Sequence, residues 1–391
     1  MQEHLTPAAA LPADGTAGTL VGRAWVPGAV PGPSVVAIRE DGVFDLGRSA
    51  PTMTELLDGV DPVALARGRG ERLGDLAPIL ANSAYDRRDP ARPYLLAPCD
   101  LQAIKASGVT FATSLLERVI EEQARGDAGK AEAIRRTISE VIGTDLSQIA
   151  PGSEAAMRLK AHLIAERAWS QYLEVGIGPD AEIFTKTAPM AAVGTGSEIG
   201  IRADSSWNNP EPELVVAVNS RGEIVAATLG NDVNLRDLEG RSALLLGKAK
   251  DNNASCAIGP FLRLLDDSFG LADVRRATIS LRVEGDDGFA LTGTSSMSEI
   301  SRDITDLVGQ TIGPNHQYPD GLMLFAGTMF APIQDRDQPG SGFTHKPGDV
   351  VEIACPELGT LVNRVNHCDR IAAWTFGTNA LLRNLSARGL L

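Results

Sequence analysis

The chain has 391 residues, of which 43% are hydrophobic and 22% charged, so it can form a large core and is long enough for two or three domains. Its 50 acidic and 36 basic residues give a net charge of −14, which disfavours nucleic-acid binding because an acidic surface repels phosphate. No apolar run approaches the ~20 residues of a membrane helix, and the first 18 residues lack the pattern of a secretory signal. Four cysteines are too few for a disulfide scaffold, so we expect a cytoplasmic protein without membrane partners.

The N-terminal half predicts a β-rich region followed by helices. Residues 1–18 are rich in Ala, Pro and Gly and are expected to be flexible. β-Branched runs separated by turn residues predict a β-rich N-terminal domain over residues 19–99. Residues 100–176 are expected to form a helical segment, since apolar residues recur there with helical spacing and Asp100 is a suitable N-cap. The expected helices cover residues 100–108, 110–126, 130–143 and 154–173, the last with Ser153 as its N-cap.

The C-terminal part, residues 177–391, returns to a β pattern with short helices and is expected to be the catalytic domain. Its expected strands cover residues 213–220, 223–232, 277–284, 321–328 and 349–355. Its expected short helices cover residues 260–267, 298–312 and 378–388.

Three carboxylates in this part form a candidate metal site. Glu211 and Glu213 stand two residues apart at the start of a strand, so both side chains point to the same face. A hairpin with its turn near residues 221–222 would return Asp232 to the start of that strand. Burying such carboxylates requires a cation or a proton between them, and a hard divalent cation suits oxygen ligands. The pattern alone also fits an acidic strand end that faces solvent.

A chain of short motifs resembles the fumarylacetoacetate hydrolase superfamily. The motifs are Ala-Glu-Ile-Phe-Thr-Lys at 181–186, Glu-Pro-Glu at 211–213, Gly-Asn-Asp-Val-Asn-Leu-Arg-Asp at 230–237, the stretch 247–260 and Ala-Gly-Thr at 326–328. The resemblance covers residues 177–391 and implies an α+β fold with a mixed β-roll catalytic domain, usually in dimers. It also implies that Glu211, Glu213 and Asp232 hold a divalent metal, Mg²⁺ first, with Mn²⁺ or Ca²⁺ as alternatives.

Within the superfamily the chain is most similar to the branch that dehydrates 2-keto-3-deoxy pentonates of the D-xylonate/D-arabinonate type. That resemblance implies a lyase that forms 2,5-dioxopentanoate through a metal-stabilised enolate, with Glu182 and Lys250 as the acid–base pair. Lys186 and Thr328 are candidates for binding the substrate, a small 2-oxo sugar acid. Burial and an adjacent cation would lower the pKa of Lys250 toward neutrality. A homodimer or homotetramer is expected.

Two departures separate the chain from the hydrolases of the superfamily. Pro189 stands where those enzymes have a water-activating histidine, and Glu239 where they have a glutamine. A carbon–carbon hydrolase is the second hypothesis. It ranks below the dehydratase because it needs a base to activate water, and no histidine lies between residues 163 and 315 to supply one locally. A catalytically silent sugar-acid-binding protein is the third, although an intact acid–base set argues against it.

Overall fold

The structure is a computed structural model that describes residues 1–391 except 132–133, 135–148, 166–168, 331 and 339–341. The helices are α1 (Pro7–Ala10), α2 (Met53–Leu57), α3 (Pro62–Arg67), α4 (Leu76–Asn82), α5 (Ala112–Ala124), α7 (Glu154–Ala165), α8 (Gln171–Ile177), α9 (Arg236–Glu239), α10 (Leu246–Lys250), α11 (Leu271–Val274), α12 (Ile304–Thr311) and α13 (Thr378–Ala387). The strands are β1 (Leu20–Val26), β2 (Gly32–Arg39), β3 (Gly42–Asp45), β4 (Glu71–Gly74), β5 (Tyr94–Leu96), β6 (Ala103–Gly108), β7 (Glu182–Thr187), β8 (Glu198–Ile201), β9 (Asn208–Asn209), β10 (Pro212–Val218), β11 (Ile224–Asp232), β12 (Asn234–Leu235), β13 (Cys256–Leu264), β14 (Thr278–Glu284), β15 (Ala290–Ser296), β16 (Leu322–Phe325), β17 (Val350–Cys355) and β18 (Gly359–His367).

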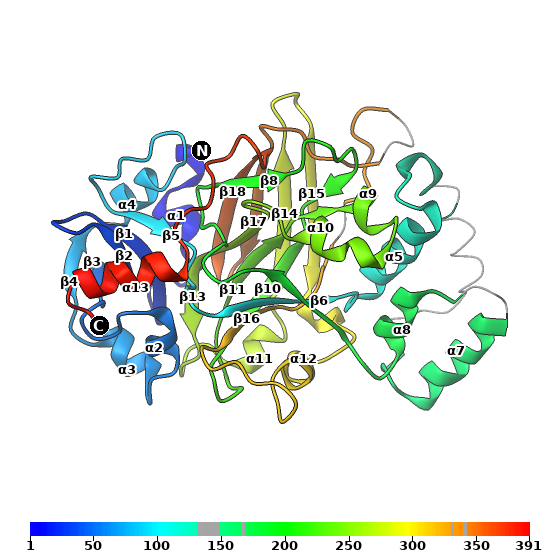
Figure 1. Cartoon of the computed structure of the whole chain (residues 1–391), viewed down its shortest axis with the longest axis horizontal. Coiled ribbons are helices and arrows are strands. Elements are labelled where there is room, and N and C mark those ends of the chain that lie inside the picture. The colour runs from blue at the N-terminus through cyan, green and yellow to red at the C-terminus, as the bar shows by residue number, and fades with distance from the viewer. Residues whose placement is uncertain (132–133, 135–148, 166–168, 331, 339–341) are drawn as a thin grey trace.

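One large sheet joins the N-terminal strands to the C-terminal ones. Its order is β4-β3-β2-β1-β13-β11-β10-β16-β6-β7, with β5 also paired to β1. Strand β13 makes the junction, because Leu20 of β1 pairs with Arg263 and Gly230 of β11 pairs with Ile258. The N-terminal strands therefore extend the sheet that carries the C-terminal strands, as the ribbon shows (Figure 1).

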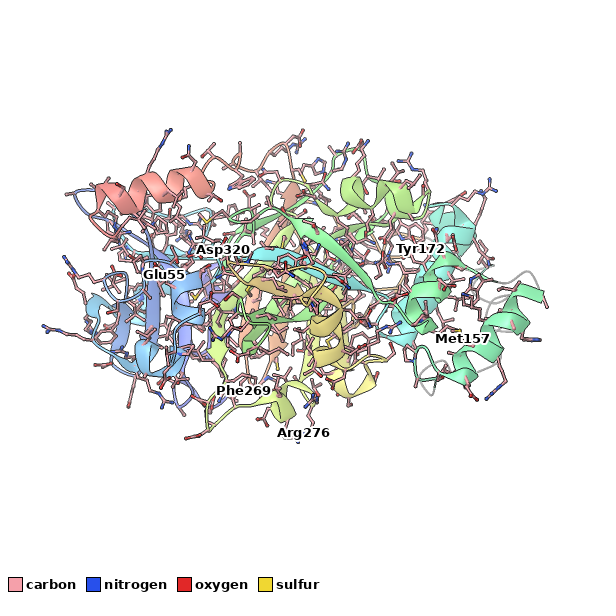
Figure 2. The ribbon with its side chains drawn as sticks, turned by 60° about the horizontal axis from the view of Figure 1, so that its bottom comes forward. Glu55, Met157, Tyr172, Phe269, Arg276 and Asp320 are labelled. Carbon is pink, nitrogen blue, oxygen red and sulfur yellow. The ribbon has the colours of Figure 1, made fainter. Side chains whose placement is uncertain are left out.

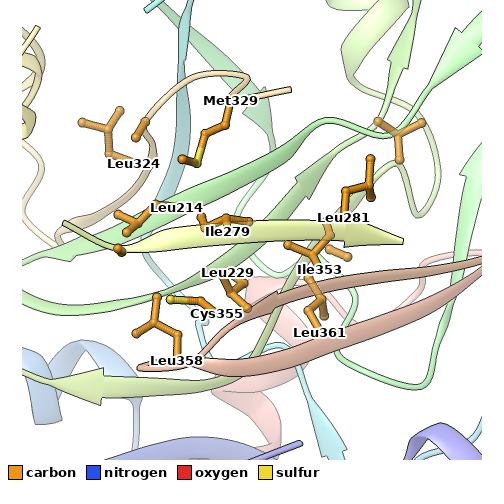
Figure 3. Packing of buried hydrophobic residues seen from close by; sticks show 14 of the residues in the cluster. Leu214, Leu229, Ile279, Leu281, Leu324, Met329, Ile353, Cys355, Leu358 and Leu361 are labelled. Carbon is orange, nitrogen blue, oxygen red and sulfur yellow. The ribbon is translucent and has the colours of Figure 1, made fainter. Parts of the chain in front are cut away.

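A second sheet packs against the middle of the first. Its order is β15-β14-β17-β18-β8. Every residue of β10 is buried, as expected where both faces of a sheet are covered, whereas β14 alternates between exposed and buried residues because one face meets solvent. The two sheets enclose a core in which the labelled side chains of both are gathered (Figure 3). This α+β architecture is the predicted fold class.

The helices α5, α7 and α8 lie at the opposite end of the molecule from the N-terminal strands (Figure 1). Helix α5 packs on α8 and carries the apolar residues Leu115, Val119 and Ile120 into a small core of its own. On α7, Met157 and Ile164 stay 36% and 51% exposed, and Met157 lies at this helical end (Figure 2). Most of the helix predicted at 130–143 lies outside the described residues.

The flexibility expected of residues 1–18 stays a prediction, although Leu5 and Ala10 are buried and Asp14 pairs with Arg263 at 2.6 Å. Two other sequence expectations are wrong. The helix predicted at 100–108 is β6, which pairs in parallel with β16. The helix predicted at 260–267 is instead mostly part of β13. Each error has the same cause, since long-range pairing decides the state of a short apolar run that local periodicity leaves ambiguous.

Gly230, near the C-terminal end of β11, gives a test of this packing. A Cβ at Gly230 would overlap the ring of Phe325 and come within 2.6 Å of Val215 Cγ2. We expect Gly230→Ala to lower the free energy of unfolding by about 1–3 kcal/mol through overpacking. Thermal unfolding followed by calorimetry measures the change. The control is Gly309→Ala in α12, where a Cβ meets nothing within 4 Å, and where Ala should raise stability by up to ~1 kcal/mol. Equal stabilities of Gly230→Ala and wild type would contradict the packing argument.

Candidate metal and acid–base site

The three predicted carboxylates meet at one end of the β10–β11 hairpin. Glu211 precedes β10, Glu213 lies within it, and Asp232 ends β11. The Asp232 backbone N–H donates to the Glu211 carbonyl at 3.0 Å, and Asn231 Oδ1 accepts from the Glu211 N–H at 3.1 Å. One oxygen from each carboxylate lies within 4.8 Å of the others, and all three side chains are buried. The proximity expected from the hairpin is thus confirmed.

Cationic side chains surround this triad. Lys250, at the end of α10, places Nζ 2.5 Å from Glu211 Oε2 and 2.9 Å from Asp232 Oδ2. Lys186 of β7 places Nζ 2.8 Å from Asp232 Oδ1. Arg118 of α5 binds the second oxygen of Glu211. Glu213 instead accepts from the Gly327 N–H at 2.7 Å and from Thr328 Oγ1 at 3.4 Å.

The ionisation of the triad indicates room for more positive charge. Burial, Asp232 and Glu211 together raise the pKa of Glu213 well above its ordinary value. Against the opposing effect of burial, the charges of Arg118 and Lys250 lower the pKa of Glu211 to about 2. Glu213 therefore takes up a proton more readily than Glu211, and a bound cation could supply the same compensation.

The charge count of the surrounding cluster points the same way. Its carboxyl groups belong to Glu121, Glu182, Glu211, Glu213, Asp232 and Glu239, and its cationic groups to Arg118, Lys186, Lys250 and Arg236. If every one of these groups is ionised, the six carboxylates exceed the four cations by two negative charges. One divalent cation would neutralise this excess. Buried oxygen ligands of this kind suit Mg²⁺, Mn²⁺ or Ca²⁺, so the residues fit the predicted metal.

Glu182 begins β7 and faces the same cluster. Its neighbour across the sheet is Gly108 of β6, where a Cβ would overlap the Glu182 carboxylate, so the side chain needs this glycine. The chain just before Glu182 is fixed by Arg302, which donates to the carbonyls of Gly178 and Pro179 at 2.6 and 3.2 Å. Burial, followed by the charge of Glu239, raises the pKa of Glu182 to about 7. A carboxyl group with this pKa exchanges a proton readily near neutral pH.

Glu182, Lys250, Glu211 and Asp232 line one small pocket, whereas Glu213 is not part of its lining. The pocket is lined by Ser107, Gly108, Val109, Ser114, Arg118, Glu182, Phe184, Glu211, Asp232, Glu239, Lys250 and Thr328. Within the described residues no histidine is part of this lining, and Pro189 is not part of it either. Lys186 also lies outside the lining: its side chain is 0% exposed and is held by Asp232 and by the Val233 carbonyl at 3.2 Å. Its role in substrate binding stays a prediction, as does that of Thr328.

The ionisation of Lys250 depends on the carboxylates beside it. Burial alone would lower its pKa, but the carboxylates of Asp232 and Glu211 outweigh burial and raise the pKa above its ordinary value. Lys250 is therefore held as an ammonium rather than as a neutral amine. The sequence expectation concerned a lysine beside a bound cation and did not count these two carboxylates, so it stays a prediction for the metal-loaded protein.

Arg118 and its partners are not predicted by the sequence. Arg118 lies 2.6 Å from Glu121 and 3.3 Å from Glu239, while Arg236 lies 3.1 Å from Glu121. In the sequence, Glu239 stands out only as a departure from the hydrolases. The sequence signal available for Arg118 and Glu121 is weak: a charged i,i+3 pair on a helix otherwise expected to be structural.

Comparison with known proteins places the fold in a family. Residues 168–366, just over half of the chain, match the family described as Fumarylacetoacetate (FAA) hydrolase C-terminal. The chain belongs to the fumarylacetoacetate hydrolase family. The predicted membership is thereby confirmed.

Two curated relatives share about a third of their aligned residues with the chain. A protein of Haloferax volcanii named probable 2-keto-3-deoxyxylonate dehydratase is 34% identical over 50% of this chain. A 2-dehydro-3-deoxy-D-arabinonate dehydratase of Saccharolobus solfataricus is 33% identical over 47% of this chain. The alignments span 63% and 58% of the relatives' own lengths.

Solved structures resemble nearly the whole chain in fold. The apo form of 2-keto-3-deoxy-D-arabinonate dehydratase matches with a TM-score of 0.59 and 21% identity, covering 89% of this chain and 99% of the other. The same enzyme complexed with magnesium and 2,5-dioxopentanoate gives a TM-score of 0.58 at 22% identity, with the same coverage. A fumarylacetoacetate hydrolase from Exiguobacterium antarcticum gives 0.55 at 16% identity, again with 89% and 99% coverage. At these identities the likeness shows the shared fold.

The raised pKa of Glu182 predicts how stability depends on pH. Because the folded-state pKa of about 7 exceeds the ordinary value of 4.5, burying Glu182 costs nothing below pH 4.5 and costs progressively more as pH rises through 7. Glu182→Gln mimics the protonated form and carries no such cost. The free energy of unfolding of the metal-free variant, relative to metal-free wild type, should therefore rise by about 1–3 kcal/mol from pH 5 to pH 8. Thermal unfolding at both pH values measures the gain. The exposed Glu299→Gln should give no pH-dependent difference, and a pH-independent difference for Glu182→Gln would contradict the assignment.

Proposed function

We propose that the chain is a divalent-metal-dependent hydro-lyase that converts a 2-keto-3-deoxy pentonate of the D-xylonate or D-arabinonate type into 2,5-dioxopentanoate. The observation that carries this proposal is that Glu182 and Lys250 line the same pocket as Glu211 and Asp232, two of the three carboxylates of the buried triad. The names of both curated relatives support the same reaction class.

Each protein group has a task that its protonation state allows. A divalent ion bound to the triad would act as a Lewis acid toward the carboxylate and 2-oxo oxygens of the substrate. Glu182, with a pKa of about 7, takes the proton from C3. Lys250, held as an ammonium, donates a proton to the C4 hydroxyl, which leaves as water. Lys250, now neutral, then takes a proton from C5 while Glu182 returns its proton to C3, which restores both groups, and the resulting enol at C4–C5 becomes the aldehyde. The sum is loss of one water.

The pocket supports dehydration over hydrolysis. A carbon–carbon hydrolase must activate a water molecule, and no histidine is found in the pocket lining of the described chain. The proposed dehydratase needs no such group, because Glu182 and Lys250 can carry out both proton transfers.

We further propose that the enzyme acts in the cytoplasm as a homodimer or homotetramer. In support, all four cysteines are free thiols, which suits a reducing compartment. No helix among the described residues is long and apolar enough to cross a bilayer. Size-exclusion chromatography with light scattering measures the oligomer.

Incubation with Mg²⁺ and 2-keto-3-deoxy-D-xylonate tests the reaction. We expect an aldehyde proton to appear in the NMR spectrum at the rate at which substrate disappears, and we expect EDTA to abolish turnover. Glu211→Gln should weaken metal binding, since an amide is a poorer ligand for a hard cation. The exposed Glu223→Gln serves as the control and should retain wild-type turnover. Full activity in a metal-free preparation, or preferential cleavage of an acylpyruvate, would overturn the proposal.

Replacement of Lys250 by Met tests the proton donor. Because Met keeps most of the stem volume and loses the ionisable amine, turnover should fall by about 10²–10⁴-fold. Steady-state rates over a Mg²⁺ titration distinguish a catalytic lysine, for which the rate stays low at saturating metal, from a charge-balancing lysine, for which excess metal restores the rate. Lys248→Met, on the same helix but exposed, should leave both the rate and the metal dependence unchanged.

A further inference from the structure

A second hollow, of about 550 Å³, lies away from the catalytic pocket and shares no lining residue with it. It forms where the segment after β3 and the segment before β4 leave the same end of the sheet, since Asp45 of β3 pairs with Glu71 of β4. Arg388 and Leu390, which follow α13, line the third side, and α13 itself lies beside the N-terminal strands (Figure 1). The lining consists of Asp45, Leu46, Gly47, Arg48, Ser49, Arg69, Gly70, Glu71, Arg388 and Leu390.

One wall of this hollow is rigidly built. Arg388 is anchored on β2, where it donates to the Pro33 carbonyl and to Ser34 Oγ, each at 2.7 Å. Asp45 is also engaged, because its Oδ1 accepts from the Gly47 N–H at 2.7 Å and its Oδ2 lies 3.9 Å from Arg388. Neither side chain therefore compensates other charges in the hollow.

Two further arginines in the lining remain unpaired. Arg48 and Arg69 are exposed and form no hydrogen bond or ion pair with any described residue. In a chain of net charge −14, the three guanidinium groups of this hollow exceed its two carboxylates, Asp45 and Glu71, by one positive charge, and two of the three have no partner in the described part of the chain. A carboxylate bound between Arg48 and Arg69 would receive charge-assisted, forked hydrogen bonds.

The remaining polar groups restrict the ligand. Glu71 and the hydroxyl of Ser49 line the same hollow and can accept hydrogen bonds from hydroxyl groups. Glu71 would repel a second carboxylate placed beside it, so a polyacid fits poorly. The volume lies within the range of sites for small molecules.

We propose that this hollow is a second binding site, for a small hydroxylated monocarboxylate such as a sugar acid, held by Arg48 and Arg69 through its carboxylate and by Glu71 and Ser49 through its hydroxyls. The site is independent of turnover, so it stands or falls separately from the proposed dehydratase activity.

Calorimetric titration with D-gluconate tests the site in the metal-loaded protein. In the Arg48→Gln/Arg69→Gln variant the Kd of D-gluconate should rise at least about tenfold, because both partners of the carboxylate are lost. Both residues are exposed and unpaired, so the variant should unfold at the wild-type temperature. Arg370→Gln/Arg383→Gln removes the same charge from exposed positions outside the hollow and should leave the Kd unchanged.

Two further measurements distinguish binding in this hollow from binding in the catalytic pocket and from simple charge attraction. Butyrate, a carboxylate without hydroxyls, should bind at least about tenfold more weakly than D-gluconate. The KM for the pentonate should be the same in wild type and in the Arg48→Gln/Arg69→Gln variant. An unchanged Kd in that variant would mean that D-gluconate binds only in the catalytic pocket, and would overturn the proposal. Equal binding of butyrate and D-gluconate would overturn the recognition of hydroxyls.

Discussion

Three carboxylates buried within 4.8 Å of one another must be compensated, and this requirement organises the polar groups around the pocket. The compensation comes from distant parts of the chain: Arg118 from α5, Lys186 from β7 and Lys250 from α10. Breaking a buried ion pair by removing one partner costs far more than an exposed pair, because the remaining charge stays desolvated. The helical end, the large sheet and the hairpin are thus coupled through the electrostatics of one site. The carboxylates of the whole cluster still outnumber its cationic side chains, so a divalent ion would balance the remaining negative charge.

The sequence was sufficient to predict the local geometry of the triad. Alternation along a strand places Glu211 and Glu213 on one face, and a hairpin brings Asp232 beside them, so only neighbouring residues enter the argument. The order of the motifs also predicted the family and the α+β fold, which the comparisons confirm. The roles of Glu182 and Lys250 stay predictions, although both side chains reach the pocket.

What the sequence could not predict depends on contacts between distant residues. Arg118 reaches Glu211 only because α5 packs over the end of the hairpin, and no local pattern marks that approach. The stretch that forms β13 is buried along its whole length and reads as an apolar run, which suits a strand or a buried helix equally. Hydrogen bonding to β1 and β11 on its two sides makes this stretch a strand rather than a helix. The sequence also does not indicate that the pKa of Lys250 is raised, because that shift depends on carboxylates brought in from other strands.

The position of β13 between β1 and β11 also constrains the order in which the chain can fold during synthesis. Strand β1 pairs early with β2 and β5, but Leu20 and Val21 obtain their partners in β13 only when residues 262 and 263 have left the ribosome. Until then, the hairpins of the N-terminal strands present an unpaired sheet edge, and closing so long a loop is slow because its entropy must be lost before the pairing contributes. An exposed edge of this kind is a template for wrong strand pairing. The start of β1 is therefore open to wrong strand pairing until β13 has been synthesised.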